Sequence, residues 1–323
     1  MNLHTKMDEY ITSPKHVLDT IKSHGVAIIP SLLDGDEIDN MNDGMWNYLE
    51  HITADFTVPI NRDDEKSWRS FYNLYPIHSM LIQHWDIGHA QHVWDLRQNP
   101  KVVDVFANIW NCKGTDLLTS FDGSSFHFPP EETNRGFFKK SSLHCDQSFT
   151  RNKFECVQSW ITGYDVNTDD ATLLFLDNSH KYHLEFKEYF DADSKDDWHI
   201  LNEEEYNFYK AKGCIEKRIS CPAGSMVLWD SRTIHCGSEP LQTRKEPNLR
   251  NVSYICMMPR SMSTPANIDK KISALVNLRT TTHWACKTKL FPKVPRTYGG
   301  PIPNVKSINP PVLTELGRKL AGY

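Results

Sequence analysis

The sequence lacks the features of secreted and membrane-spanning proteins. Its eight cysteines are scattered without a Cys-x-x-Cys pair, and in a chain of 323 residues such cysteines are expected to be reduced thiols rather than a disulfide framework. The first ten residues contain acids and no apolar core, and no run of about 18 apolar residues is present. We therefore expect a cytoplasmic protein without a secretory signal or a membrane-spanning segment.

The chain also has no excess of positive charge. Lys and Arg number 36 against 41 Asp and Glu, and the formal net charge of -5 predicts no general attraction to nucleic acid or anionic lipid. The part from Arg260 onward nevertheless holds eleven basic and two acidic residues, which is net +9. This basic stretch admits an acidic substrate, CoA-like phosphates or nucleic acid, but a solvated strap that offsets an acidic body is the simpler interpretation.

No internal repeat or low-complexity tract is present, and the length suits one decorated domain. We expect a single domain over 1–323 with a helical N-terminal part (1–115), a jelly-roll core (about 116–260) and a basic, proline-rich C-terminal strap (261–323) that is irregular from Phe291. Apolar residues at spacings of three and four, together with capping residues, predict three helices in the first part, over 15–24, over 34–51 and from Asn99 onward.

From about Leu117 the chain changes to short runs of branched and aromatic residues separated by turn formers. Because these runs do not alternate with long helices, they predict a mainly β fold with flanking helices, an antiparallel barrel or jelly roll. The predicted strands are 117–121, 154–166, 171–176, 225–229 and 251–258.

Three residues form a candidate metal site. His144 and Asp146 are two residues apart, so in an extended segment both project to the same side while Cys145 points away. A second imidazole, His235, ends another strand-like run after a Pro-Ala-Gly turn. Two imidazoles and one carboxylate on one face of an iron ion leave three positions open, which is the arrangement of non-haem Fe(II) oxygenases.

Four stretches of the chain carry a more specific resemblance. They are Gly25-Val-Ala-Ile-Ile-Pro-Ser-Leu-Leu, His144-Cys-Asp-Gln, residues 169–181 and residues 222–235. In this order they resemble the phytanoyl-CoA dioxygenase family of Fe(II)- and 2-oxoglutarate-dependent oxygenases. The resemblance implies a double-stranded β-helix, a cupin-like jelly roll, with His144, Asp146 and His235 as the catalytic iron ligands.

The same resemblance implies a site for 2-oxoglutarate. The family uses an arginine at the start of the strand after the distal histidine to bind the far carboxylate of this cosubstrate, and Arg250 matches that position best. Arg244 is the competing candidate, because the loop between His235 and Arg250 is long. Trp160 matches a position in the pocket wall, although an apolar strand residue is as readily explained as core.

The activity that follows from the resemblance is hydroxylation or a related oxidation of a small molecule, with O2 consumed and succinate and CO2 released. Halogenating relatives replace the carboxylate ligand with a small residue, so Asp146 argues against halogenation. Ascorbate is a possible reductant. The substrate stays open among fatty acyl-CoA, an amino acid derivative, a secondary metabolite, and a modified base or protein side chain.

The sequence also allows two other functions. A catalytically silent binding protein and a differently metallated cupin, such as an isomerase, fit the same ligands.

Three weaker patterns are also present. The histidines at 84, 89 and 92 are interpreted as a polar helical face rather than a metal pair. Asp122 and Gly123 suit either a substrate-facing position or a turn. Cys145 and Cys236, beside the expected ligands, are open to oxidation but are more simply small buried residues.

Overall fold

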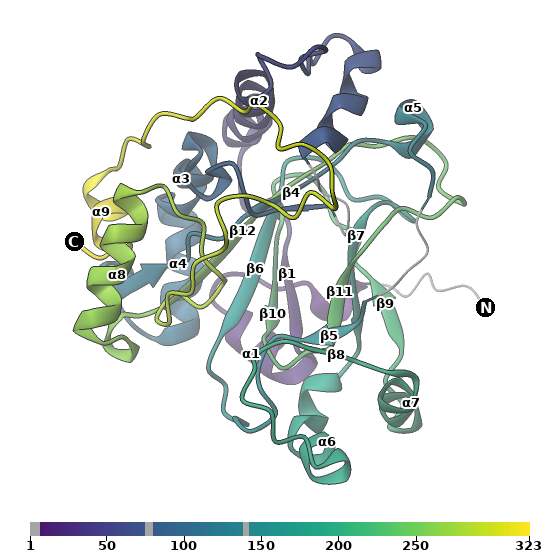
Figure 1. Cartoon of the computed structure of the whole chain (residues 1–323). Coiled ribbons are helices and arrows are strands. Elements are labelled where there is room, and N and C mark those ends of the chain that lie inside the picture. The colour runs from purple at the N-terminus through teal and green to yellow at the C-terminus, as the bar shows by residue number, and fades with distance from the viewer. Residues whose placement is uncertain (1–6, 75–79, 138–141) are drawn as a thin grey trace.

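The computed structural model describes residues 7–74, 80–137 and 142–323, and its centre is a pair of facing β-sheets (Figure 1). Every described pairing between two strands is antiparallel, as predicted. The larger sheet has the order β1 (Val26–Ile29), β10 (Met226–Asp230), β6 (Val157–Thr162), β12 (Arg250–Pro259), β4 (Ser124–His127) and β2 (Leu81–Ile82), and β3 (Leu117–Thr119) also pairs with β12. The smaller sheet has the order β8 (His199–Ile200), β5 (His144–Cys145), β11 (His235–Ser238), β7 (Thr172–Leu176) and β9 (Glu216–Arg218).

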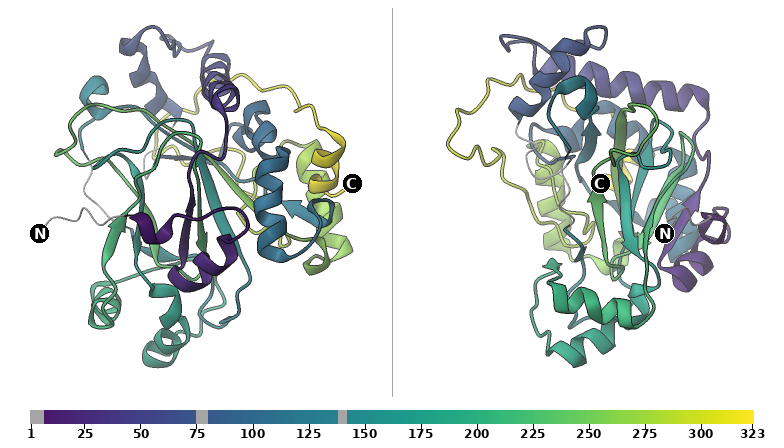
Figure 2. Two further views of the ribbon diagram at one scale, coloured as in Figure 1. Left: turned by 180° about the vertical axis from the view of Figure 1, so that it is seen from behind. Right: turned by 90° about the vertical axis from the view of Figure 1, so that its right-hand side faces the viewer.

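Helices lie at the periphery of the two sheets (Figure 2). The described α-helices are α1 (Val17–His24), α2 (Gly35–Ile52), α3 (Gln91–Arg97), α4 (Pro100–Trp110), α5 (Pro130–Thr133), α6 (His183–Phe190), α7 (Glu203–Ala211), α8 (Pro265–Val276) and α9 (Glu315–Ala321). Short 3-10 helices are η1 (Met7–Tyr10), η2 (Glu65–Leu74), η3 (Ile87–His89), η4 (Gly114–Asp116), η5 (Ser179–Tyr182) and η6 (Arg260–Met262). None of the helices in the described ranges is both long and apolar enough to cross a lipid bilayer.

The three predicted helices are present with the expected ends. Helix α1 ends at Gly25, whose φ of 78° is accessible to glycine at little cost. Helix α2 begins with a capping box, in which Asp34 and Glu37 each accept a hydrogen bond from the other's backbone N–H. Asn99 caps α4 and Pro100 occupies its first turn. Apolar spacing together with capping residues therefore placed these helices correctly.

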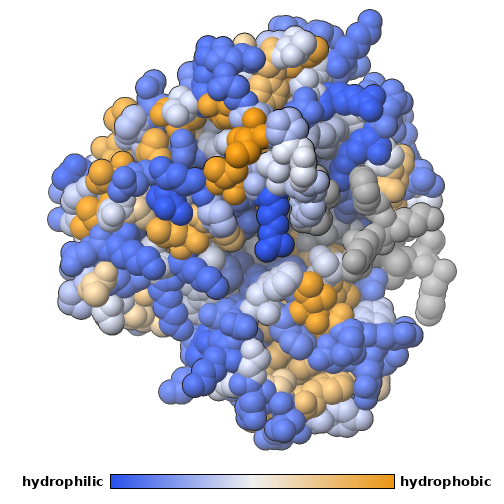
Figure 3. All heavy atoms as spheres, viewed as in Figure 1, coloured by the Kyte–Doolittle hydropathy of each residue, from blue (hydrophilic) through white to orange (hydrophobic). Residues whose placement is uncertain are grey.

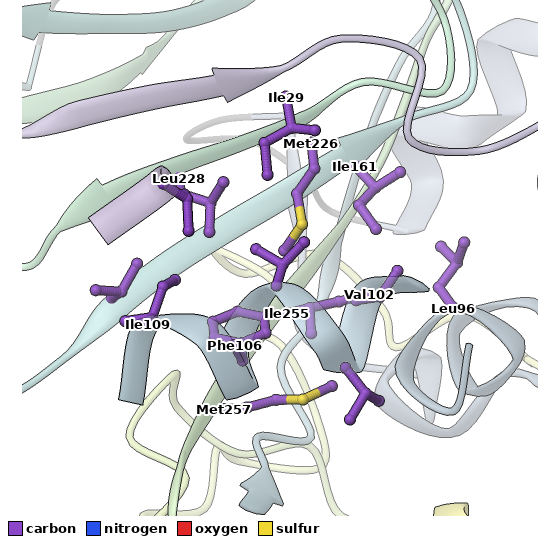
Figure 4. Packing of buried hydrophobic residues seen from close by; sticks show 14 of the residues in the cluster. Ile29, Leu96, Val102, Phe106, Ile109, Ile161, Met226, Leu228, Ile255 and Met257 are labelled. Carbon is purple, nitrogen blue, oxygen red and sulfur yellow. The ribbon is translucent and has the colours of Figure 1, made fainter. Parts of the chain in front are cut away.

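The outer face of the larger sheet is a continuous apolar layer against α1 and α4. Figure 4 shows the part that α4 covers. Phe106 and Ile109 of α4 pack against Ile161, Leu228 and other strand residues that project outward. Neighbouring strand residues point the opposite way, so Trp160 belongs to a second buried cluster between the two sheets. Strand β6 therefore has one face that packs against the helices and an opposite face that borders the barrel interior.

The smaller sheet is covered on its outer face by α6 and α7. Cys145 and Cys236 are buried in this layer with Phe186 and Tyr209, on the side of the sheet opposite their neighbours His144 and His235. All eight cysteines are thiols rather than disulfides. The interpretation of Cys145 and Cys236 as small buried residues is therefore confirmed. Between the lobe of α6 and α7 and the rest of the molecule, the surface is hollowed (Figure 3).

Several expectations need correction. Strand β6 is shorter than the predicted 154–166, and β4 and β9 were missed because each is too short to show periodicity. The C-terminal stretch is irregular over 291–314, as predicted, but it also contains helices α8 and α9, which pack beside each other and close to α4 (Figure 1). The polar face proposed for His89 and His92 is wrong, because their exposed fractions are 0% and 5%.

Candidate metal centre

Three side chains converge where β5 and β11 meet. His144 and His235 are register partners in these antiparallel strands, so their rings leave the sheet on one face with centroids 4.6 Å apart. Asp146 lies two residues after His144, and its side chain is on the same side as the two rings. One ligand atom from each of the three lies within 4.8 Å of the others, and no other group of three His, Cys, Asp or Glu in the described ranges meets this criterion.

Backbone carbonyl groups set the orientation of both imidazoles. His144 donates from Nδ1 to the carbonyl oxygen of Ser142 at 2.7 Å, and His235 donates from Nδ1 to that of Thr233 at 2.9 Å. Because a carbonyl only accepts, Nδ1 carries the hydrogen and Nε2 keeps its lone pair. Both Nε2 atoms face Asp146, at 3.7 Å from Oδ1 for His144 and 3.4 Å from Oδ2 for His235. The free lone pairs therefore point to one place.

A side chain of the larger sheet also contacts the carboxylate. Gln158 of β6 donates from Nε2 to Oδ2 of Asp146 at 3.0 Å, which links the two sheets at this point. Burial by itself raises the pKa of Asp146, but the neighbouring rings of His144 and His235 outweigh this effect and keep the pKa below its ordinary value. Burial also lowers the pKa of His144. Asp146 therefore stays ionised near neutral pH, and burial favours the neutral form of His144.

These residues fit a divalent transition metal such as iron. The donor set is two imidazole nitrogens and one carboxylate. His144 and His235 lie on β5 and β11, Asp146 follows β5 directly, and each of the three has a hydrogen-bond partner within the protein. The structure thus brings together the three residues that the sequence singled out. What the sequence did not indicate was Gln158, which lies twelve residues from Asp146 in a different sheet.

A second charged group, Arg250, lies inside the barrel at the start of β12. Its Nε donates to Ser125 Oγ at 3.2 Å and its Nη1 to the carbonyl oxygen of Ala171 at 3.1 Å. The guanidinium carbon lies 5.4 Å from the ring centroid of Trp160, which is fully buried. Burial lowers the pKa of Arg250, and no ion pair joins it to a carboxylate among the described residues. It is a buried cation with unused donor capacity.

Arg244, the competing candidate, is already paired. Its side chain is 2% exposed and forms ion pairs with Glu131 of α5 and, from Nη1, with Asp170 Oδ1 at 3.3 Å. Its Nε donates to Glu131 Oε1 at 2.8 Å. A guanidinium that already binds two carboxylates has little capacity for a third. Arg250 therefore keeps donor capacity that Arg244 lacks.

Two further polar groups lie near the metal centre. Asp122, suggested by the sequence as a substrate-facing residue, is 9% exposed, and burial raises its pKa to about 7. His283 of the C-terminal stretch has its ring against the backbone of Asp146 and was not predicted. No signal in the sequence marks it, because it lies 48 residues after His235 and outside the stretches that carry the resemblance.

Comparison with known proteins gives one curated relative and a shared fold. Ava biosynthesis cluster protein O from Aspergillus versicolor is 24% identical over 275 residues, which cover 82% of this chain and 84% of that protein. The putative oxidoreductase from Salmonella typhimurium LT2 is 12% identical, with a TM-score of 0.59 and coverage of 97% and 86%. GlcNAc Inducible Gene 2 from Candida albicans is 13% identical, with a TM-score of 0.53 and coverage of 82% and 67%. The two structures show that the fold is shared.

The match to a protein family is more specific than these pairwise similarities. Residues 21–246 match phytanoyl-CoA dioxygenase, and this segment contains most of the barrel together with His144, Asp146 and His235. It ends just before Arg250 and β12, and it leaves the C-terminal stretch outside. Because it covers more than half of the chain, the protein belongs to the phytanoyl-CoA dioxygenase family of iron- and 2-oxoglutarate-dependent non-haem oxygenases.

Proposed function

We propose that this protein is a dioxygenase that uses Fe(II), 2-oxoglutarate and O2 to hydroxylate a small molecule and releases succinate and CO2. The observation that supports this most strongly is the relation of Gln158 to Trp160 on β6. The two residues are two apart and share one face of the strand; one binds Asp146 and the other lies beneath Arg250. The metal ligands and Arg250 therefore both border the interior of the barrel.

In this proposal each residue has a distinct role. His144, Asp146 and His235 hold the iron, and the bound iron supplies the activation of O2 and the decarboxylation of the cosubstrate. Arg250 binds the far carboxylate of 2-oxoglutarate with two parallel N–H donors, and Trp160 forms the wall beneath it. The low dielectric of the buried pocket strengthens this pairing and keeps water away from the reacting groups.

Hydroxylation is favoured over halogenation by the carboxylate ligand itself. Asp146 is oriented by Gln158 and faces both imidazole Nε2 atoms, so it occupies the position that a halide would need. The relative from Aspergillus versicolor is named as a protein of a biosynthesis cluster, which favours a small metabolite as the substrate. The net charge of -5 argues against nucleic acid. We infer a cytoplasmic enzyme, with ascorbate as a possible reductant.

The test is an anaerobic titration of the metal-free protein with Fe(II) and then 2-oxoglutarate, followed by visible absorption. We expect a metal-to-ligand charge-transfer band that needs both additions, and slow succinate formation once O2 is admitted. The Arg250→Ala variant should bind Fe(II) normally but develop the band only at much higher 2-oxoglutarate concentration.

Two outcomes would favour the alternatives. A band without succinate from any tested substrate would indicate a silent binding protein. Binding of another metal in preference to Fe(II), with no effect of 2-oxoglutarate on the spectrum, would indicate a differently metallated cupin.

A further inference from the structure

A loop of the C-terminal stretch is fixed against the barrel close to the metal centre. The N–H of Thr281 donates to the carbonyl oxygen of Phe121 at 2.9 Å, and the N–H of Phe121 donates to Thr281 Oγ1 at 3.0 Å. Thr281 also forms an antiparallel bridge with Leu290, so the residues between them form a closed loop. This loop lies outside the segment that matches the family, which ends at residue 246.

The side chain of Trp284 anchors this loop. It is 4% exposed and packs in a buried cluster with residues of β3 and β12, among them Leu118 and Cys256. Arg151 and Lys287 place their charges over its ring, with the guanidinium carbon at 5.2 Å and Nζ at 4.6 Å from the centroid. The neighbouring residue, His283, is therefore held in a defined position rather than carried by a free surface loop.

His283 lies next to the metal centre without belonging to the ligand set. Its ring lies beside the backbone of Asp146 and within electrostatic range of His235. The N–H of Asp146 is already donated to Ser231, so the group available to the ring is the carbonyl oxygen. Nε2 of His283 is buried and has no hydrogen-bond partner among the described residues. It is also not among the ligand atoms that lie within 4.8 Å of one another.

A buried nitrogen without a partner is costly, and the cost disappears if a bound molecule supplies the missing hydrogen. Because a carbonyl oxygen only accepts, the nitrogen that faces Asp146 carries the ring hydrogen, which leaves Nε2 as an acceptor. The donor that a metal ion would bring to this place is a coordinated water, since the triad leaves three positions open.

We propose that Nε2 of His283 accepts a hydrogen bond from a water molecule on an open position of the metal and so holds this water until the substrate displaces it. This inference rests on the proposed function. Its consequence is protective: O2 reacts slowly while the water remains, and uncoupled consumption of 2-oxoglutarate is suppressed. A segment outside the family match would thus tune the reactivity of a site that the barrel builds.

The test uses the full-length protein loaded with Co(II), which tolerates air and whose visible bands are weak with six ligands and stronger with five. The variants are His283→Ala, His283→Phe, which keeps the ring volume without an acceptor, and His283→Gln, which restores an acceptor oxygen. His92→Ala is the matched control, because His92 is also a buried histidine with an unpartnered Nε2 but has no contact with the triad. Each protein is measured with saturating 2-oxoglutarate.

We expect stronger bands in His283→Ala and His283→Phe, recovery in His283→Gln and no change in His92→Ala. The Kd for Co(II) should change less than about threefold, and with Fe(II) the substrate-free rate of succinate formation should rise about fivefold in the first two variants, the factor that one lost hydrogen bond implies. Unchanged bands in both variants would overturn the inference, and so would a large loss of Co(II) affinity, which would make His283 a ligand. If the wild type binds no Co(II) or shows no response to 2-oxoglutarate, the proposed function fails before any variant is compared.

Discussion

The barrel interior has two polar sites that lack different kinds of partner: the three metal ligands at one end and Arg250 at the other. At the metal end, His144, His235 and Asp146 each have a hydrogen-bond partner within the protein, and the Nε2 atoms of both imidazoles face the carboxylate. At the other end, Arg250 is buried above Trp160 with a full charge and no carboxylate among the described residues. The first end needs a cation and the second needs an anion. A metal ion with a bound dicarboxylate meets both needs, because the metal is the cation and the far carboxylate is the anion.

The largest effect is expected at the metal end. Replacement Asp146→Ala removes the only carboxylate of the triad, so Fe(II) binding and iron-dependent succinate formation should fall to background. Binding is measured by anaerobic titration and turnover by a succinate assay. Asp55→Ala, which removes an exposed carboxylate, should retain both properties. Activity retained by Asp146→Ala would mean that another residue is the carboxylate ligand.

The next effect separates the two arginines. Arg250→Ala should raise the Kd for 2-oxoglutarate about 100-fold with little change in Fe(II) affinity, because a buried carboxylate would lose its only cation. Arg244→Ala should leave the Kd nearly unchanged but lower the free energy of unfolding by about 3 kcal/mol, because Asp170 would become an unpaired buried charge. Isothermal titration and chemical denaturation measure the two quantities. The opposite pattern would assign the cosubstrate to Arg244.

A smaller effect is expected where the two sheets meet. Gln158→Ala removes the amide that orients Asp146, so Fe(II) affinity should fall about tenfold, the size typical of an outer partner of a metal ligand. Gln158→Met, which keeps the length of the side chain but has no N–H donor, should lose the same factor in Fe(II) affinity. Equal affinity in all three proteins would show that the backbone alone orients the ligand.

The smallest effect is expected from Trp160→Phe. The indole Nε1 has no hydrogen-bond partner among the described residues, and a phenyl ring still provides a face beneath Arg250. We expect the Kd for 2-oxoglutarate to change less than about threefold, while unfolding becomes easier by about 1 kcal/mol because of the smaller ring. A much larger loss of affinity would show that the indole N–H itself contacts the cosubstrate.

Much of the barrel and its ligands could be predicted because the signals are local. Alternation along a strand places His144 and Asp146 on one side whatever the remainder of the chain does. The caps at Asp34 and Asn99 also act within a few residues of themselves. Strands β4 and β9 gave no such signal, since three or four residues are too few to show a period.

The choice between Arg244 and Arg250 needed contacts that are distant in the sequence. Arg244 lies 113 residues after Glu131 and 74 after Asp170, and no local pattern shows that the barrel brings these acids to one arginine but leaves the other without them. The same limit applies to His89 and His92, whose spacing suggested a solvated helical face although both are buried.

The sequence by itself determined the chemical types present: two imidazoles, one carboxylate, several arginines and a strand-rich framework, because these follow from residue identity and local periodicity. Only the tertiary structure decided which of them are left unpaired. The register of β5 with β11 brings the imidazoles together, Glu131 and Asp170 pair with Arg244, and a loop near the C-terminus brings His283 to Asp146. The physical reason is that pairing and burial depend on long-range packing, and an unpaired buried group is what a ligand is needed to satisfy.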